Sequence, residues 1–191
     1  MLKRKIEKDI MRWIESSDKA LLIYGVRQAG KTYIVRECLK AAGCDYIEFN
    51  LIRQPEIVEI LDGATGIDDL ILKLSLYSDK KIVPGKTFFF FDEIQRYKEI
   101  VTKIKFLVDD KRFRYIMSGS LLGVEIVNLK SAPVGYLQTL NMYPLDFEEF
   151  LFANGMNETV ISAMRQKFDK LESLEESMHD KMMDLFRKYL L

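Results

Sequence analysis

The strongest constraint on this sequence is a glycine-containing segment that follows a short apolar run near the N-terminus. Residues 25–32 read G-V-R-Q-A-G-K-T and fit the pattern G-x-x-x-x-G-K-[S/T]. Residues 21–24 before it are apolar and predict a strand, and residues 33–42 after it have the character of a helix. A strand, a glycine loop and a helix in this order form the context that a phosphate-binding loop requires. The segment therefore predicts a nucleotide-binding site.

The residues of this loop suit different parts of a nucleotide. Gly25 and Gly30 allow backbone torsions that a side chain would forbid, so that consecutive N–H groups can surround a phosphate. The following helix adds its unpaired N–H groups and the positive end of its dipole. Lys31 supplies charge for the β- and γ-phosphates, and the Thr32 hydroxyl suits Mg²⁺. The alternative is a plain tight turn with a solvated lysine. The predicted nucleotide-binding residues are Gly25, Val26, Arg27, Gln28, Ala29, Gly30, Lys31, Thr32 and Tyr33.

A second constraint is the run of four phenylalanines at residues 88–91, which ends in Asp92 and Glu93. An apolar run without alternation is typical of a strand that is buried on both faces of a parallel sheet. Carboxylates at the end of such a strand are costly unless they are paired or bind a metal. In a phosphate-loop protein, Asp92 would hold Mg²⁺ and Glu93 would activate the attacking water. Alone, the pair also fits an exposed strand end with an acidic helix cap.

The remaining pattern predicts an α/β fold. Strands are expected at residues 45–51, 114–117 and 137–143, and helices near residues 56–61, from Asp68 onward and at residues 98–109. An amphipathic helix leads the chain within residues 1–17. Ser118 directly follows a strand, and ligands bind at the carboxyl ends of parallel strands, so Ser118 is expected beside the γ-phosphate. An ordinary Ser-Gly turn is the alternative. Residues 121–129 predict a loop or a short helix.

After Pro144 the composition changes, and we expect a P-loop domain at residues 1–145 and a helical lid at residues 146–191. Asp146 and Glu149 have the spacing of a capping box, and Gly155 should end the helix that they begin. From Glu158 onward the chain is charged and helical. Its apolar stripe comprises Leu171, Leu174, Met178, Met182, Leu185 and Tyr189. Because no cap follows Tyr189, we expect a longer protein that continues beyond Leu191.

Composition limits the function classes. The chain has 191 residues, with 29 basic and 29 acidic ones, so net charge implies neither a nucleic-acid nor an acidic-membrane partner. Cys38, Cys44 and the single His179 offer no zinc-site pattern. No signal-peptide pattern and no run near the ~20 apolar residues of a membrane span is present. We therefore expect a cytoplasmic location.

Four ordered motifs resemble a family of prokaryotic AAA+-like ATPases. The loop at residues 25–32 is similar to that family's G-x-R-Q-x-G-K-T, and residues 88–95, F-F-F-F-D-E-I-Q, resemble its Walker B strand with D-E-x-Q. Residues 117–122, M-S-G-S-L-L, resemble its sensor segment, and residues 144–150, P-L-D-F-E-E-F, its P-L-x-F-x-E-F ending. The resemblance covers most of residues 21–150. One departure is Tyr136, where members often carry Arg or Lys.

The resemblance implies a three-layer P-loop NTPase fold with a mostly parallel five-stranded sheet in the order 5-1-4-3-2 and a small C-terminal helical lid. It also implies further C-terminal domains in the same protein. The function expected is an ATPase that cleaves ATP to ADP and phosphate with Mg²⁺. Lys31, Glu93 and Ser118 are the expected catalytic residues, and Thr32 and Asp92 the metal ligands.

Two other functions stay open. One is an ATP-dependent switch or interaction module with negligible hydrolysis, and the other is a small-molecule kinase, although adjacent carboxylates suit water activation better. A homo-oligomer is a candidate partner. In it Arg96 or Arg114 would act on a neighbouring subunit, since an arginine supplied in trans is worth ~10³–10⁵ in rate in other phosphoryl-transfer enzymes.

Overall fold

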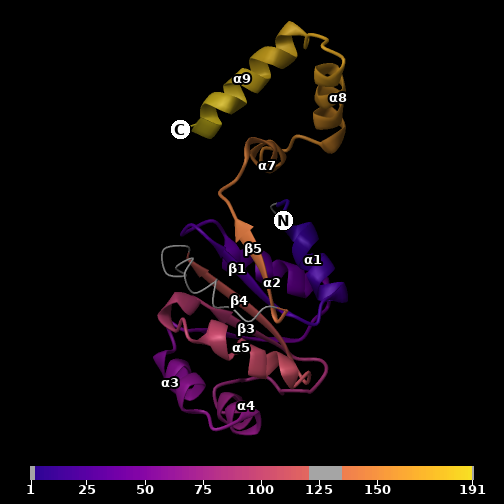
Figure 1. Ribbon diagram of the computed structural model, residues 1–191. Coiled ribbons are helices and arrows are strands. Elements are labelled where there is room, and N and C mark those ends of the chain that lie inside the picture. The colour runs from indigo at the N-terminus through magenta and orange to yellow at the C-terminus, as the bar shows by residue number, and fades with distance from the viewer. Residues whose placement is uncertain (1–2, 121–134, 191) are drawn as a thin grey trace. The chain divides into compact units, whose positions relative to one another are not determined.

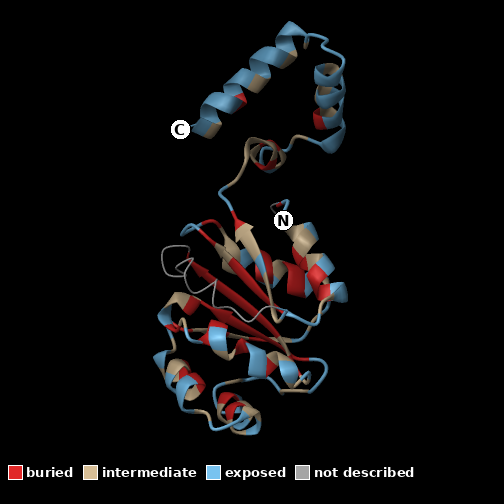
Figure 2. Cartoon of the chain, viewed as in Figure 1, coloured by how far each residue is buried: buried red, intermediate tan, exposed pale blue. Residues whose placement is uncertain are grey.

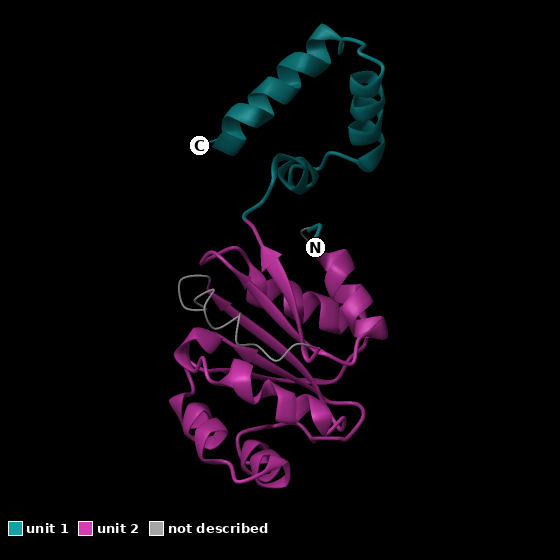
Figure 3. Ribbon diagram, viewed as in Figure 1, with its two compact units in different colours: residues 1–5, 144–191 teal, residues 6–143 magenta. Residues whose placement is uncertain are grey.

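The computed structural model describes residues 3–120 and 135–190, so the predicted loop or short helix at residues 121–129 lies outside the described part. The chain forms two compact units (Figure 3). The larger comprises residues 6–143, and the smaller comprises residues 1–5 together with residues 144–191.

The larger unit is built on a five-stranded sheet in the order β2-β3-β4-β1-β5, in which every pairing is parallel (Figure 1). This confirms the predicted order 5-1-4-3-2. Because all strands run the same way, their carboxyl ends meet at one edge of the sheet. The strands are β1 (Ala20–Gly25), β2 (Tyr46–Asn50), β3 (Phe88–Asp92), β4 (Arg114–Ser120) and β5 (Leu137–Met142).

Helices cover both faces of this sheet and make the three layers that were predicted. One core joins one face to α1 and α2, and a second core joins the other face to α3, α4 and α5. The helices are α1 (Glu7–Ser16), α2 (Lys31–Ala41), α3 (Pro55–Gly63), α4 (Ile67–Ser75) and α5 (Ile100–Asp109), with a 3₁₀ turn η1 (Ile94–Arg96).

Strand β3 explains the phenylalanine run. Phe88 and Phe90 belong to the core under α1 and α2, whereas Phe89 and Phe91 belong to the core under α3, α4 and α5. All four side chains are buried, and β3 lies inside the sheet between β2 and β4 (Figure 2). The prediction of a strand buried on both faces is therefore confirmed, and both cores depend on it.

Arg114 at the start of β4 fixes the end of α1. Its guanidinium donates hydrogen bonds to the carbonyls of Trp13 at 2.7 Å, Ile14 at 2.6 Å and Ser17 at 2.7 Å. It also lies 4.5 Å from the ring centre of Trp13 and 4.7 Å from that of Phe88. The Trp13 carbonyl also accepts from the Ser17 N–H at 3.1 Å, and Arg114 adds side-chain donors to the carbonyls at this helix end. The Arg114 side chain is therefore engaged inside its own chain.

The described residues of the smaller unit form three helices, and its core is formed by Leu151, Ile161 and Leu185. The predicted capping box is present: Asp146 accepts from the Glu149 N–H at 2.8 Å, and Glu149 accepts from the Asp146 N–H at 3.2 Å. The helices are α7 (Phe147–Ala153), α8 (Glu158–Asp169) and α9 (Glu176–Leu190).

One expectation for this unit is wrong. The chain is not helical from Glu158 to its end, because a connection separates Asp169 from Glu176. Leu171 lies in that connection with a φ of 57°, and it is 92% exposed. Leu171 therefore does not extend the apolar stripe. On α9, Leu185 and Met182 of the stripe belong to the core of this unit.

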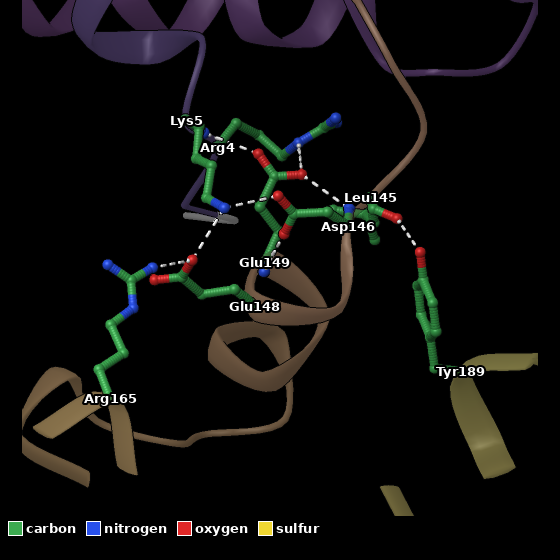
Figure 4. A network of polar contacts seen from close by, with 8 residues as sticks. All are labelled: Arg4, Lys5, Leu145, Asp146, Glu148, Glu149, Arg165 and Tyr189. Carbon is green, nitrogen blue, oxygen red and sulfur yellow. Dashed lines mark hydrogen bonds and ion pairs between the residues drawn. The ribbon is translucent and has the colours of Figure 1, made fainter. Parts of the chain in front are cut away.

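Basic residues at the N-terminus also belong to the smaller unit (Figure 4). Arg4 and Glu149 form an ion pair at 3.1 Å in which the side chains are only 6% and 7% exposed. The Lys5 backbone N–H donates to Glu149 at 2.7 Å, and its ammonium contacts Asp146 at 2.6 Å and Glu148 at 2.8 Å. These contacts attach Arg4 and Lys5 to α7, although the sequence analysis assigns both residues to the P-loop domain.

Candidate functional site

The loop between β1 and α2 turns through two left-handed residues. Gln28 has a φ of 63° and Gly30 a φ of 92°, and Gly30 is the residue before α2. Alternation of right- and left-handed torsions turns successive N–H groups toward one concave side. No side chain caps the first turn of α2, which points its N–H groups and dipole in the same direction. Gly30 therefore has the conformational role that the sequence predicts.

Gly25 is required for a different reason from the predicted one. It is the last residue of β1 and pairs with Met142 of β5. A Cβ at Gly25 would lie 2.0 Å from the Met142 carbonyl oxygen, far inside contact distance. The expectation that Gly25 supplies an unusual torsion is thus corrected: its role is to let the backbone of β5 approach.

Lys31, the first residue of α2, folds back over the loop. Its ammonium donates to the carbonyl of Val26 at 2.7 Å and to that of Gly25 at 3.1 Å. Burial lowers the pKa of Lys31, and this effect is opposed by the nearby carboxylates of Glu93 and Asp92. A half-buried ammonium held at the mouth of the loop is well placed to exchange these carbonyls for phosphate oxygens.

Asp92 is the centre of a polar cluster at the carboxyl ends of three strands and the start of α2. The Thr32 hydroxyl donates to its carboxylate, 3.1 Å from each oxygen. The Ser118 hydroxyl donates to Oδ1, and the Asn50 amide donates to Oδ2 at 3.0 Å. Asp92 is 4% exposed and Ser118 is fully buried. The structure thus brings Thr32, Asp92 and Ser118 together, as expected, but Ser118 faces Asp92.

Burial dominates the electrostatics of this cluster. It raises the pKa of Asp92, and the hydrogen bonds from Ser118 and Thr32 offset part of that effect. Burial disfavours the charged form of the Asp92 carboxyl group more than these hydrogen bonds favour it.

Glu93 follows in an unusual backbone conformation, with a φ of 60° and a ψ of 43°. This torsion ends β3 and starts η1. Its carboxylate accepts a hydrogen bond from the amide of Gln95, whose oxygen accepts from the Ser120 N–H at 3.1 Å. Non-glycine residues in this region are uncommon and concentrate at functional sites.

The sequence analysis gives no role to Asn50, which contacts Asp92, or to Gln95, which contacts Glu93 and stands in the D-E-x-Q motif. Asn50 ends β2 in register with Asp92, so that parallel pairing alone places the two side by side. Its amide oxygen also accepts from the N–H groups of Ile52 at 3.1 Å and Arg53 at 3.0 Å. A polar residue that ends a predicted strand is the signal that would have identified Asn50.

The cluster fits Mg²⁺ bound with a nucleotide. Thr32 and Asp92 offer hard oxygen ligands at the mouth of the loop, and Mg²⁺ commonly takes only one or two protein ligands together with water and phosphate oxygens. Among the described residues there is no group of three or more His, Cys, Asp or Glu side chains that would hold a metal by itself. The donor set therefore suits an ion that arrives with phosphates.

A family model described as an AAA domain matches residues 17–151, which is more than half of the chain. The chain belongs to the AAA domain family. At the family level, this makes it a nucleotide-binding P-loop ATPase domain. The matched range runs from the end of α1 to α7 and includes all members of the polar cluster.

Solved structures similar to this AAA domain include the Aeropyrum pernix Orc1 protein in complex with DNA, with 14% identity and a TM-score of 0.47, over 80% of this chain and 50% of that one. A Walker-type ATPase of Pyrococcus abyssi has 16% identity and a TM-score of 0.49, and the match covers 82% of this chain and 60% of that one. Drosophila ORC bound to DNA has 15% identity and a TM-score of 0.49, and the match covers 86% of this chain and 47% of that one. The chain thus spans about half the length of these structures. No curated protein matches it.

Tyr136 lies at the opposite end of the sheet from the phosphate-binding loop of the AAA domain. Its carbonyl accepts from Ala20 at the start of β1, whereas Met142 at the far end of β5 pairs with Gly25. At ~3.3 Å per residue the two ends are about 20 Å apart. The Tyr136 backbone therefore lies at the edge of the sheet opposite the loop. Lys105 of α5 lies 5.5 Å from the Tyr136 ring centre.

A cavity of about 450 Å³ lies elsewhere in the AAA domain, among α3, α4 and α5. Its wall includes Leu70, Tyr97 and Phe106, and it shares no residue with the phosphate-binding loop. Within residues 3–120 and 135–190, no helix is long and apolar enough to cross a membrane.

Proposed function

We propose that this AAA domain binds ATP with Mg²⁺ and hydrolyses it to ADP and phosphate. The observation that carries the proposal is that Lys31 and Thr32, at the start of α2, lie with Asp92 at the carboxyl edge of the sheet. Glu93 is the next residue in the chain. The loop N–H groups and Lys31 would hold the phosphates, and Thr32 and Asp92 would hold Mg²⁺. The ion supplies charge neutralisation for the β- and γ-oxygens.

Glu93 is proposed as the general base. A water oxygen forms a bond to the γ-phosphorus while the bond between that phosphorus and the β–γ bridging oxygen breaks, so ADP leaves. The proton of the water passes to the Glu93 carboxylate. Ser118 would act on the same site through its hydroxyl, which donates a hydrogen bond to Asp92. Asn50 would orient Asp92 from the side of β2.

The proposal is tested with Glu93→Gln, which keeps shape and removes the base. ATP affinity with Mg²⁺ is measured by calorimetry, and phosphate release is measured on the same samples. We expect unchanged affinity and turnover lower by about 100-fold or more. Gln166→Ala, on the exposed side of α8, is the matched control. Normal turnover by Glu93→Gln would exclude Glu93 as the base.

The same experiment separates the alternatives. Binding by wild type without phosphate release would identify an ATP-dependent switch, whose bound state acts through a partner. Phosphate transfer to an added acceptor instead of water would identify a kinase. A second copy of the chain is the proposed protein partner. If self-association assists hydrolysis, turnover per chain should rise with protein concentration.

A cytoplasmic location is also proposed. The unpaired Cys38 and Cys44 agree with it.

A further inference from the structure

The Gln95 side chain links Glu93, which follows β3, to Ser120 at the end of β4. The backbone pairs of these two strands stop before this point, at Phe91 and Met117. Its side-chain nitrogen donates to the Glu93 carboxylate, and its side-chain oxygen accepts from the backbone N–H of Ser120 at 3.1 Å. Glu93 leaves β3, whereas Ser120 ends β4, the strand that also carries Ser118. One amide therefore spans the proposed base and the end of the neighbouring strand.

The two partners determine which way the amide faces. A carboxylate can only accept, and a backbone N–H can only donate, so the Gln95 nitrogen must face Glu93 and its oxygen must face Ser120. Glutamate at this position would keep the acceptor for Ser120 but lose the donor for Glu93. Leucine, of similar size, would lose both bonds. The requirement for one donor and one acceptor is thus specific to an amide side chain.

The backbone under Gln95 is held on both sides. Ile94 is fully buried, and Tyr97 is 6% exposed, with its hydroxyl donating to Asp62 of α3 at 2.9 Å. The Arg96 N–H donates to the Glu93 carbonyl at 3.1 Å, and the Tyr97 N–H donates to that of Ile94 at 2.9 Å. The 3₁₀ turn is therefore anchored before and after Gln95, and the remaining freedom of Glu93 is in its side chain.

We propose that Gln95 is a positioning residue, which holds the Glu93 carboxylate in the direction required to activate water and ties that direction to the end of β4. The inference rests on the proposed hydrolytic function. A glutamate side chain has several rotatable bonds, and a misplacement near 1 Å can cost ~10² in rate. A single charge-assisted hydrogen bond from a rigidly held amide restricts those bonds before the nucleotide arrives.

The test uses Gln95→Leu and Gln95→Glu, each made in the wild-type chain and in the Glu93→Gln chain. In the wild-type background we expect turnover to fall by about 10- to 100-fold, with ATP affinity within ~3-fold, because the phosphate contacts are untouched. In the Glu93→Gln background we expect less than a ~2-fold further fall, since the group that Gln95 positions is already absent. Gln166→Leu on α8 is the size-matched control and should leave turnover unchanged.

The outcomes separate this inference from the function on which it rests. Equal losses in the two backgrounds, or a parallel loss of ATP affinity, would show a structural role and overturn the inference. Full turnover by Gln95→Leu would overturn it as well and leave the ATPase proposal standing. Absence of phosphate release from the wild type would overturn both. If Gln95→Leu does not fold, the same comparison of turnover in the two backgrounds is made with Gln95→Glu, which keeps the bond to Ser120.

Discussion

The Thr32 hydroxyl lies 3.1 Å from both carboxylate oxygens of Asp92, although 60 positions separate the two residues in the chain. Thr32 stands in the first turn of α2, and Asp92 ends β3. Strand β3 is not a neighbour of β1, because β4 lies between them. The contact therefore depends on the strand order and on the direction of the loop, and it brings together two oxygen ligands of the proposed Mg²⁺ site.

Replacement of Lys31 by alanine should weaken ATP binding. The substitution removes a cation from the phosphate site, and a charge-assisted hydrogen bond is worth about 1.5–3 kcal/mol, or roughly 10- to 100-fold in affinity. Calorimetric titration with ATP and Mg²⁺ measures the change. Lys181→Ala on exposed α9 is the control. An unchanged dissociation constant for Lys31→Ala would remove Lys31 from the site.

Asp92→Asn should stabilise the nucleotide-free chain at neutral pH while abolishing the Mg²⁺ dependence of ATP binding. The reason for the stability gain is that burial raises the pKa of Asp92 in the folded chain, so the folded state is destabilised once the carboxyl ionises. The melting temperature measures the gain, and ~1 kcal/mol corresponds to about 2–4 °C for a chain of this size.

The sign of this effect depends on pH in a defined way. With a pKa that is higher in the folded than in the unfolded chain, Asp92 favours folding below its unfolded value, and this contribution is lost as the pH rises through the folded value. The stability difference between Asp92→Asn and wild type should therefore increase between pH ~4 and neutral pH. A difference that stays constant over this range would contradict the assigned burial effect.

Gly25→Ala should destabilise the larger unit. The added methyl group would meet the Met142 carbonyl oxygen at 2.0 Å, and both atoms belong to paired strands that cannot separate without breaking β1–β5 hydrogen bonds. Overpacking of this kind typically costs about 1–3 kcal/mol. Denaturant unfolding measures it. Gly63→Ala at the end of α3, where a Cβ meets nothing within 4 Å, is the matched control and should not destabilise.

Removal of one partner of the buried Arg4–Glu149 pair should loosen α7. Glu149→Ala removes the buried carboxylate that pairs with Arg4, and it also removes half of the capping box. Loss of one member of a buried pair costs about 3–5 kcal/mol. Hydrogen exchange of residues 147–153 should therefore accelerate. The Arg4→Met, Glu149→Met pair of substitutions should restore part of the protection, and equal exchange in all variants would contradict the role of this pair.

Much of the fold follows from local patterns. The apolar strands, the phenylalanine run and the turn residues predict an α/β fold, and the strand order implied by the family resemblance is the order observed. The capping box of α7 can also be predicted from the sequence, because its two residues are three positions apart. The break before α9 cannot be predicted in this way, since Leu171 matches the helical spacing while its backbone is left-handed.

The amino-acid sequence alone determined the phosphate-binding loop and the buried β3 with its terminal carboxylates, because each depends on residues that are close in the chain. It also determined the membership in the AAA domain family, through motifs in a fixed order along residues 17–151. Tertiary structure alone decided that Asn50 and Gln95 contact Asp92 and Glu93, that Gly25 serves β5, and that Arg4 and Lys5 join α7. These relationships depend on strand register and on which segments pack together. A pairing shifted by one residue would place a different side chain beside Asp92, and composition does not specify that register.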